Sequence, residues 1–186
     1  MNILILFGSP KRTGYTQKMV DTFLQNLQQP CQVSYARVFD MLPIPCNDCG
    51  YCKRSDGCSK KDLDNFIEQY KAADFILVAT PIYLYSMPAP LKALFDRFQR
   101  FYSARFYRGL AKPIEKPKEA VLFFTAGSIE KIGERIITEQ VKRAFSVMNT
   151  KISNTVFWEN TDTDKTGTAV LEDIARLAKC ISNSND

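Results

Sequence analysis

The chain has 186 residues, which is enough for one domain with a buried core. Hydrophobic residues make up 45% of it and charged residues 24%, and the net charge of +5 is spread along the chain. This pattern is typical of a mildly basic soluble domain, and no nucleic-acid partner is expected. The chain contains no histidine, which excludes Ser-His-Asp and Cys-His catalysis and histidine metal sites.

No apolar run approaches the roughly 20 residues needed to cross a bilayer, so no membrane association is expected. The segment Met1–Phe7 lacks the basic start of a secretory signal and leads directly into Gly8. We therefore expect a cytoplasmic protein. In that compartment the six cysteines are expected to be thiols, metal ligands or redox groups rather than structural disulfides.

Short apolar runs alternate with segments of helical periodicity along the whole chain. In chain order, the elements are a strand Asn2–Phe7, a helix Tyr15–Gln28, a strand Gln32–Val38, a helix Asp62–Ala72, a strand Ala73–Thr80, a helix Pro88–Tyr102, a strand Glu119–Thr125, a helix Glu130–Met148, a strand Lys151–Trp158 and a helix Thr168–Ile181. Such alternation predicts a parallel sheet with helices on both faces. The prediction is a single α/β domain over residues 1–186, a flavodoxin-like three-layer sandwich with five strands in the order 2-1-3-4-5.

Two segments are longer than a minimal five-stranded fold requires. One is the cysteine-rich insertion Met41–Lys61, and the other is the extended segment Ser103–Lys118. Long loops in compact domains are more often functional than idle. The second segment could be a surface excursion or a subunit contact.

The turn between the first strand and the first helix has the composition of a phosphate-binding loop. It supplies hydroxyl groups, positive charge and glycines for close backbone approach, and it has no carboxylate nearby in sequence. The candidate ligands are Ser9, Lys11, Arg12, Thr13, Gly14, Tyr15 and Thr16. The loop matches neither G-x-x-x-x-G-K-[ST] nor G-x-G-x-x-G. An ordinary polar turn would use many of the same residue types.

A second candidate region follows the third predicted strand. In the order 2-1-3-4-5 the sheet reverses between strands 1 and 3, and ligands bind beyond the carboxyl ends of the strands at that point. The loops after strands 3 and 4 would face the phosphate loop there and could cover a flat ring. The candidates are Pro81, Ile82, Tyr83, Leu84, Tyr85, Ser86 and Met87 in one loop, and Thr125, Ala126 and Gly127 in the other. The tyrosines could instead pack against the following helix.

Two motifs together resemble the NADPH-dependent FMN reductase and iron–sulfur flavoprotein family. They are Gly8-Ser9-Pro10-Lys11-x-x-Gly14-x-Thr16 and Pro81-Ile82-Tyr83-x-Tyr85-Ser86-Met87-Pro88-Ala89-Pro90-Leu91-Lys92, followed by Asp96-Arg97. The resemblance extends to about residue 130. It implies that the first motif binds the phosphate of FMN and that the second lines the isoalloxazine ring. The chain departs from the family at Tyr15, where asparagine is usual.

Four cysteines lie within 13 positions, as Cys46-x2-Cys49-x2-Cys52-x5-Cys58. Their spacing is similar to the compact motif of iron–sulfur flavoproteins, and nearby Lys and Arg residues would offset the charge of thiolates. A [4Fe–4S] cluster is one interpretation. Zinc or free thiols at a subunit contact are a second, and a redox disulfide such as Cys49–Cys52 is a third. Cys31 and Cys180 are expected to be ordinary thiols.

The resemblance implies an oxidoreductase whose chemistry is supplied by FMN, and no catalytic nucleophile is assigned. The donor would be NAD(P)H, with a quinone, free flavin or nitro compound as the small-molecule electron acceptor, or a ferredoxin acting through the cysteines. A non-catalytic electron carrier of the flavodoxin type is the alternative, although flavodoxins are typically acidic. A flavin-free regulatory module is a further alternative. The resemblance also implies a homodimer or a homotetramer.

Overall fold

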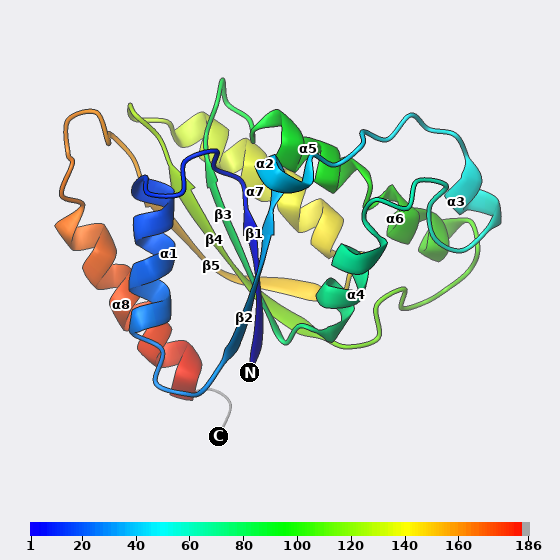
Figure 1. The fold of residues 1–186 in the computed structure, drawn as a ribbon, viewed down its shortest axis with the longest axis horizontal. Helices are drawn as coiled ribbons and strands as arrows, with labels where there is room; N and C mark the ends of the chain where they lie inside the picture. Colours follow the sequence, from blue (N-terminus) through cyan, green and yellow to red (C-terminus); the bar gives the residue numbers. More distant parts are fainter. Residues whose placement is uncertain (184–186) are drawn as a thin grey trace.

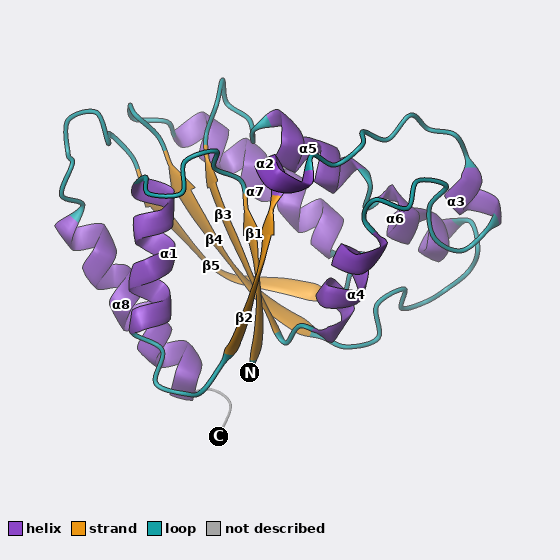
Figure 2. Ribbon diagram, viewed as in Figure 1, coloured by secondary structure: helices purple, strands orange, loops and turns teal. Residues whose placement is uncertain are grey.

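The computed structural model describes residues 1–183, so residues 184–186 of the predicted domain lie outside the described part. Its centre is one parallel sheet in the order β2-β1-β3-β4-β5 (Figure 2). The strands are β1 Asn2–Phe7, β2 Gln32–Arg37, β3 Phe75–Pro81, β4 Lys118–Thr125 and β5 Thr150–Trp158. The predicted fold class and strand order are confirmed.

Helices cover both faces of the sheet (Figure 1). One face carries α1 Tyr15–Gln25 and α8 Thr168–Asn183, and the other carries α2 Val38–Met41, α4 Asp64–Ala72, α5 Ala89–Asp96, α6 Gln99–Phe106 and α7 Lys131–Phe145. Successive side chains of a strand point to opposite faces. Ile3, Ile5 and Phe7 therefore enter the core under α1 and α8, while Leu4 and Leu6 enter the other core.

The helix predicted over Pro88–Tyr102 is in fact two helices. α5 ends at Asp96 and α6 begins at Gln99. At the junction the N–H groups of Arg97 and Phe98 donate to the carbonyls of Leu94 and Phe95, at 3.1 and 3.0 Å. This i to i−3 pattern is a tighter turn than an α-helix, and it redirects the chain. Apolar periodicity continues across the junction, so the break could not be seen in the pattern.

The two long segments contain more regular structure than predicted. Met41–Lys61 includes the one-turn helix α3 Tyr51–Arg54, and the short helix α2 ends at Met41. In the second segment, residues 103–106 are the last turn of α6 and Lys118 is the first residue of β4. The irregular part is therefore confined to residues 107–117. Helix α1 ends three residues before the predicted Gln28.

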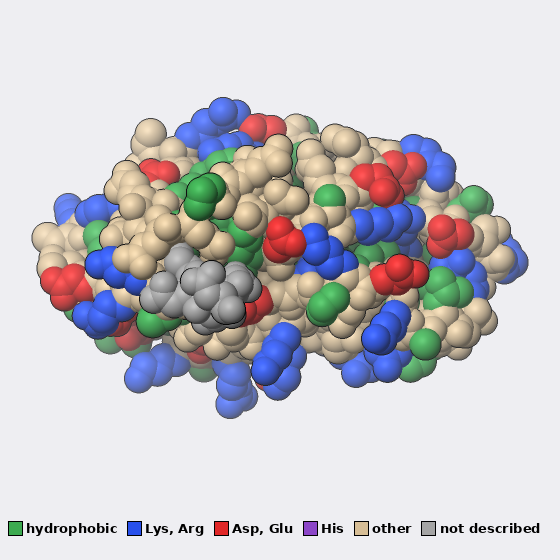
Figure 3. All heavy atoms as spheres, turned by 90° about the horizontal axis from the view of Figure 1, so that it is seen from below, with side chains coloured by type: hydrophobic (Ala, Val, Ile, Leu, Met, Phe, Trp, Pro, Cys, Tyr) green, Lys and Arg blue, Asp and Glu red, His purple; other side chains and the backbone are tan. Residues whose placement is uncertain are grey.

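Positive and negative side chains are mixed on the face of the molecule that the space-filling view shows. Figure 3 shows Lys and Arg side chains interspersed with Asp and Glu on the face viewed from below. Among residues 1–183, no helix is both long and apolar enough to span a bilayer.

Lys118 is the most buried cation after Arg97, and it closes the end of α4. Its side chain donates to the carbonyls of Lys71 and Ala73, at 3.0 and 2.9 Å, and burial lowers its pKa to about 8. Removing it leaves these helix-end carbonyls without their donor. We expect Lys118→Met to lower the free energy of unfolding by about 1–3 kcal/mol in urea titrations.

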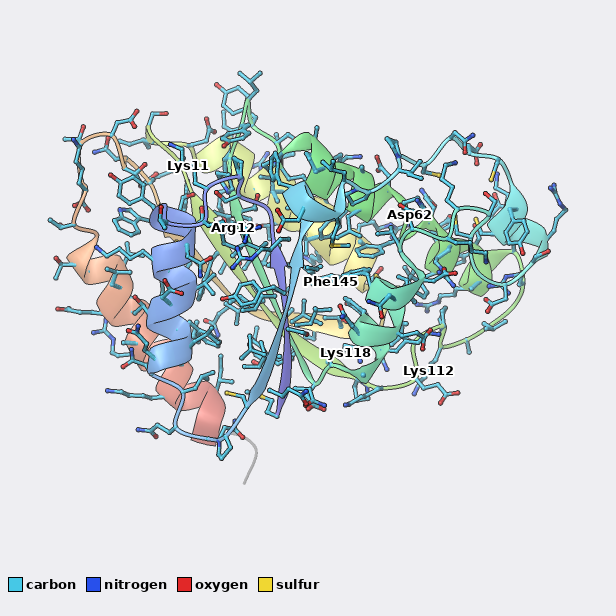
Figure 4. All side chains as sticks on the ribbon, in the orientation of Figure 1. Lys11, Arg12, Asp62, Lys112, Lys118 and Phe145 are labelled. Atoms are coloured by element: carbon cyan, nitrogen blue, oxygen red, sulfur yellow. The ribbon has the colours of Figure 1, made fainter. Side chains whose placement is uncertain are left out.

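The contribution of Lys118 to stability should also depend on pH in a definite direction. Because the folded pKa of Lys118 lies below the ordinary 10.5, the unfolded chain binds more protons between about pH 8 and 10.5. The contribution of Lys118 to stability therefore rises with pH in that window, and the difference between the variant and the parent should be larger at pH 9.5 than at pH 7.5. The exposed Lys112, labelled with Lys118 in Figure 4, provides the control Lys112→Met, for which no change is expected.

Candidate functional site

The candidate site lies where β1 and β3 run side by side and their following loops leave the sheet at the same edge. Gly8, directly after β1, donates its N–H to the carbonyl of Ala79 at 2.8 Å. A Cβ at Gly8 would lie 2.6 Å from the Thr80 hydroxyl and 2.8 Å from a methyl of Leu91. Only glycine therefore permits this approach. The predicted phosphate loop is held against β3 from its first residue.

The rest of the phosphate loop is open to solvent. Lys11, Arg12 and Thr13 are exposed, and the Lys11 N–H donates to the Ser9 hydroxyl at 3.2 Å. Gly14 caps the start of α1, whose first turn has no acidic residue. Figure 4 labels Lys11 and Arg12 beside this helix start. The exposed N–H groups and cations have the chemistry that a phosphate requires.

The phosphate loop has no carboxylate nearby in sequence, but one approaches it in space. Arg12 forms an ion pair with Asp40 of α2, at 2.7 Å between Nη2 and Oδ2. Asp40 is distant in sequence, but it follows β2, and the carboxyl end of β2 lies at the same edge of the sheet as that of β1. The signal that could have found Asp40 was its position just beyond a strand adjacent to β1.

Tyr15 and Thr16 point away from the open side of the loop. The Tyr15 ring packs edge-on against Trp158, with 4.9 Å between the ring centroids. Thr16 is 3% exposed, and its hydroxyl lies 2.9 Å from that of Thr125 at the end of β4. At these two positions the side chains are therefore engaged elsewhere, and the backbone N–H groups at the helix start are the groups that remain for a phosphate.

The loop after β3 forms a tight two-residue hairpin. Tyr83 and Ser86 exchange backbone hydrogen bonds of 2.8 and 2.9 Å. Leu84 and Tyr85 at its tip have φ values of 47° and 64°, in the left-handed region that disfavours such side chains. Leu84 is 98% exposed, and the rings of Tyr83 and Tyr85 are about half exposed. A large apolar side chain held in this way is typical of a functional site.

Two of the other predicted residues of this loop face inward. Ile82 and Met87 are buried in the core under α5 and α7, and the Ile82 N–H donates to the carbonyl of Thr125 at 2.8 Å. The two tyrosines, in contrast, are not covered by the following helix. The hairpin tip and Pro81 thus remain the parts of the loop available to a ring.

The loop after β4 lies beside an acidic residue that the sequence analysis missed. The Ala126 N–H donates to the carbonyl of Trp158, and a Cβ at Gly127 would lie 2.6 Å from a carboxylate oxygen of Asp162. Asp162 follows β5 at this edge and contacts the loop by a 3.1 Å backbone hydrogen bond to Gly127. The sequence feature that could have pointed to Asp162 was again its position just beyond a neighbouring strand.

The four clustered cysteines line one cavity of about 520 Å³ between the cysteine segment and α6. Lys53, Lys60, Arg97 and Arg100 share this lining with them. The Cys52 thiol donates to the Ser103 hydroxyl at 3.4 Å. The hydrogen bond from Ser59 lowers the pKa of Cys49, whose sulfur lies 3.2 Å from the serine oxygen. The four cysteines therefore lie around one space, and their role as ligands of one group stays a prediction.

The cavity does not have the form of a single-ion site. Cys46, Cys49, Cys52 and Cys58 are free thiols, and within residues 1–183 no three His, Cys, Asp or Glu side chains are grouped closely enough to hold one ion. A tetrahedral zinc ion would need its sulfurs about 2.3 Å from a common centre. In a cubane cluster each thiolate binds a different iron, so the sulfurs stand farther apart. Four thiols without histidine are a donor set that a cluster also accepts, and the nature of the group stays a prediction.

Comparison with known proteins identifies the family. The model of the NADPH-dependent FMN reductase family matches residues 1–163, and the chain belongs to this family. An iron–sulfur flavoprotein of Methanosarcina thermophila is 34% identical over 99 residues, covering 52% of each chain. An FMN-dependent NADH:quinone oxidoreductase of Alteromonas mediterranea is 31% identical over 110 residues, covering 53% of this chain and 55% of that protein.

The fold is also found in solved structures. The azoreductase AzrA superimposes with a TM-score of 0.74 over 97% of this chain and 100% of its own, at 16% identity. This likeness confirms the flavodoxin-like fold. The chain spans about half the length of the curated relatives it matches.

The left-handed backbone at Leu84 gives a testable consequence. Asparagine tolerates this conformation better than leucine, so Leu84→Asn should raise the free energy of unfolding by up to about 1 kcal/mol. The measurement is urea unfolding of the flavin-free chain. Ile129→Asn is the control, because Ile129 is 67% exposed and its φ is not positive. An equal gain in both variants would show that removing exposed apolar surface, and not backbone strain, was responsible.

Proposed function

We propose that this chain is an FMN-dependent oxidoreductase that takes electrons from NAD(P)H and passes them to a small acceptor such as a quinone, a free flavin or a nitro compound. The supporting observation is the convergence of three loops at the β1/β3 edge, with exposed cations on one side and a strained aromatic hairpin on the other. Bound FMN would supply the redox chemistry, accepting a hydride and returning electrons to the acceptor.

The residues of the chain would bind and orient the flavin. We assign the phosphate to Ser9, Lys11, Arg12, Thr13 and the backbone from Gly14 to Thr16. We assign the ring to Pro81 and the hairpin tip, and to Thr125, Ala126 and Gly127. Ile82 and Met87 would support the hairpin from the core side. Donors fixed in advance on rigid strand ends need no reorganisation when charge develops on the ring.

The direct test is anaerobic. The purified chain is titrated with FMN, and the complex is mixed with NADPH or NADH in a stopped-flow spectrometer. Bleaching of the flavin band within seconds, followed by saturable turnover with a quinone, is the expected result. Bleaching without turnover would favour the electron carrier, whereas no bleaching by either nucleotide would remove the hydride donor and favour ferredoxin. If the chain does not bind FMN in the titration, the flavin-free regulatory module is favoured.

The phosphate assignment predicts a difference between two flavins. Lys11→Met removes an exposed cation that would form a charge-assisted bond to phosphate, so FMN affinity should fall about tenfold or more. Riboflavin lacks the phosphate, so its affinity should stay the same. Lys112→Met, far from the loop, should change neither dissociation constant in a fluorescence titration. An equal loss for both flavins would place Lys11 against the ring or in the fold.

For the cysteine cavity we propose a [4Fe–4S] cluster, supported by four cysteines that line one cavity together with Lys53, Lys60, Arg97 and Arg100. The cations would stabilise the negative charge of the thiolates and the cluster. A ferredoxin is the alternative electron donor at this site. Zinc and a redox disulfide remain the competing proposals for the same cysteines.

Anaerobic reconstitution distinguishes these proposals. We expect about four irons and four sulfides per chain, with a broad absorption shoulder that dithionite bleaches. Cys52→Ser should lose most of the iron, and Cys31→Ser, outside the cavity, should retain it. Binding of one zinc per chain in preference to iron would support the structural site. A reversible loss of two thiols without metal would support the disulfide.

We also propose a homodimer or a homotetramer. Large apolar side chains are exposed at Leu84, at Ile129 just before α7, and at Ile132 and Ile136 in the first two turns of α7. Phe106 and Tyr107 are exposed at the end of α6. Such surfaces are typical of subunit contacts. A cytoplasmic location remains a prediction.

A further inference from the structure

Arg97 is a buried cation beneath the cysteine segment, at the junction of α5 and α6. Its side chain is 3% exposed, and it forms part of the wall of the cysteine cavity. An arginine so completely removed from water carries a large desolvation cost unless its donors are used. The partners of this guanidinium therefore indicate what it does.

Those partners are the two ends of the cysteine segment. Arg97 Nη1 donates to the carbonyl of Ile44 at 2.8 Å, and Nη2 donates to the carbonyl of Lys60 at 2.9 Å. Ile44 precedes Cys46 by two residues, and Lys60 follows Cys58 by two residues. One planar group thus bonds the backbone on both sides of all four cysteines.

Asp62 completes the connection. It forms an ion pair with Arg97, at 2.9 Å between Oδ1 and Nη1, and its Oδ2 accepts the N–H of Ile44 at 3.0 Å. Figure 4 labels Asp62 where the segment returns toward α4. Together the two side chains close a loop whose ends would otherwise have to be brought together against chain entropy.

One hydrogen-bond donor of the guanidinium is not used. Its Nε is buried and has no hydrogen-bond partner within the described part of the chain. Two other cations of the cavity wall form longer ion pairs: Lys53 with Asp48 at 3.4 Å, and Arg100 with Asp64 at 3.7 Å. A buried N–H without an acceptor carries a desolvation cost, which an acceptor in the adjoining space would remove.

We propose that Arg97 is the positioning residue of the cysteine site. It holds the two ends of the segment so that the four cysteines line one cavity, where the anionic, thiolate-ligated group would bind. The inference rests on the proposed cluster for the identity of that group. The clamping of the segment ends does not depend on the cluster.

The test compares Arg97→Gln, Arg97→Lys and the matched control Arg100→Gln in the full chain. Arg100 lines the same cavity but bonds neither end of the segment, so it reports the effect of losing charge alone. Two quantities are measured. One is amide hydrogen exchange over residues 44–60 of the metal-free protein, relative to the amides of β1 and β3. The other is the iron and sulfide bound after anaerobic reconstitution.

We expect Arg97→Gln to accelerate exchange in the segment about tenfold or more, because two or three charge-assisted bonds are lost, while β1 and β3 stay protected. Bound iron should fall below half of the parent value. Arg97→Lys should be intermediate, since a single ammonium cannot reproduce the bidentate geometry. Arg100→Gln should leave exchange in the segment unchanged.

Parent-like exchange in Arg97→Gln would overturn the proposal, as would equal effects of Arg97→Gln and Arg100→Gln. If the parent chain binds no iron, the cluster proposal fails by itself, and hydrogen exchange still decides whether Arg97 holds the segment. If Arg97→Gln does not fold, Arg97→Lys takes its place. General unfolding of Arg97→Lys as well would assign Arg97 to the core and overturn the positioning role.

Discussion

The geometry of the proposed flavin site depends on how closely the chain after β1 approaches β3. Gly8 bonds to Ala79 and leaves no space for a side chain next to Thr80. This contact fixes the start of the phosphate loop at the point where the strand order reverses, which is where α/β sheets bind ligands. A larger residue at position 8 would move the whole loop away from the strand that carries the hairpin.

Thr125 ties the other loops to that contact. Its hydroxyl is bonded to that of Thr16 at the start of α1, and its carbonyl accepts the N–H of Ile82 before the hairpin. One residue at the end of β4 therefore connects the phosphate side of the site with the ring side. Because Thr16 and Thr125 are both buried, these bonds are little exposed to competition from water. The distance between the two sides is thus set by the sheet and not by loop flexibility.

The sequence was sufficient for the fold because the three central strands, β1, β3 and β4, are short apolar runs followed by clear turn signals. It was not sufficient where contacts join segments distant in the chain. The pairing of Arg12 with Asp40, the approach of Asp162 to Gly127 and the bonds from Arg97 to Ile44 and Lys60 all belong to this class. The break between α5 and α6 was missed for a related reason. The apolar pattern reports which residues are buried, and here Phe95, Phe98 and Phe101 are buried on both sides of the break.

Helix α5 places the two candidate sites in a fixed relation. It begins two residues after the buried Met87, at the base of the hairpin, and it ends next to Arg97 at the cysteine cavity. Its eight residues span about 12 Å, and Leu91, Leu94 and Phe95 anchor it in the core. A packed helix of this kind cannot change length, so the hairpin and Arg97 keep their separation whatever occupies either site. The part of the arrangement that could move is the cysteine segment, and Arg97, directly after α5, bonds both of its ends. The same helix supports the hairpin to which we assign the flavin ring.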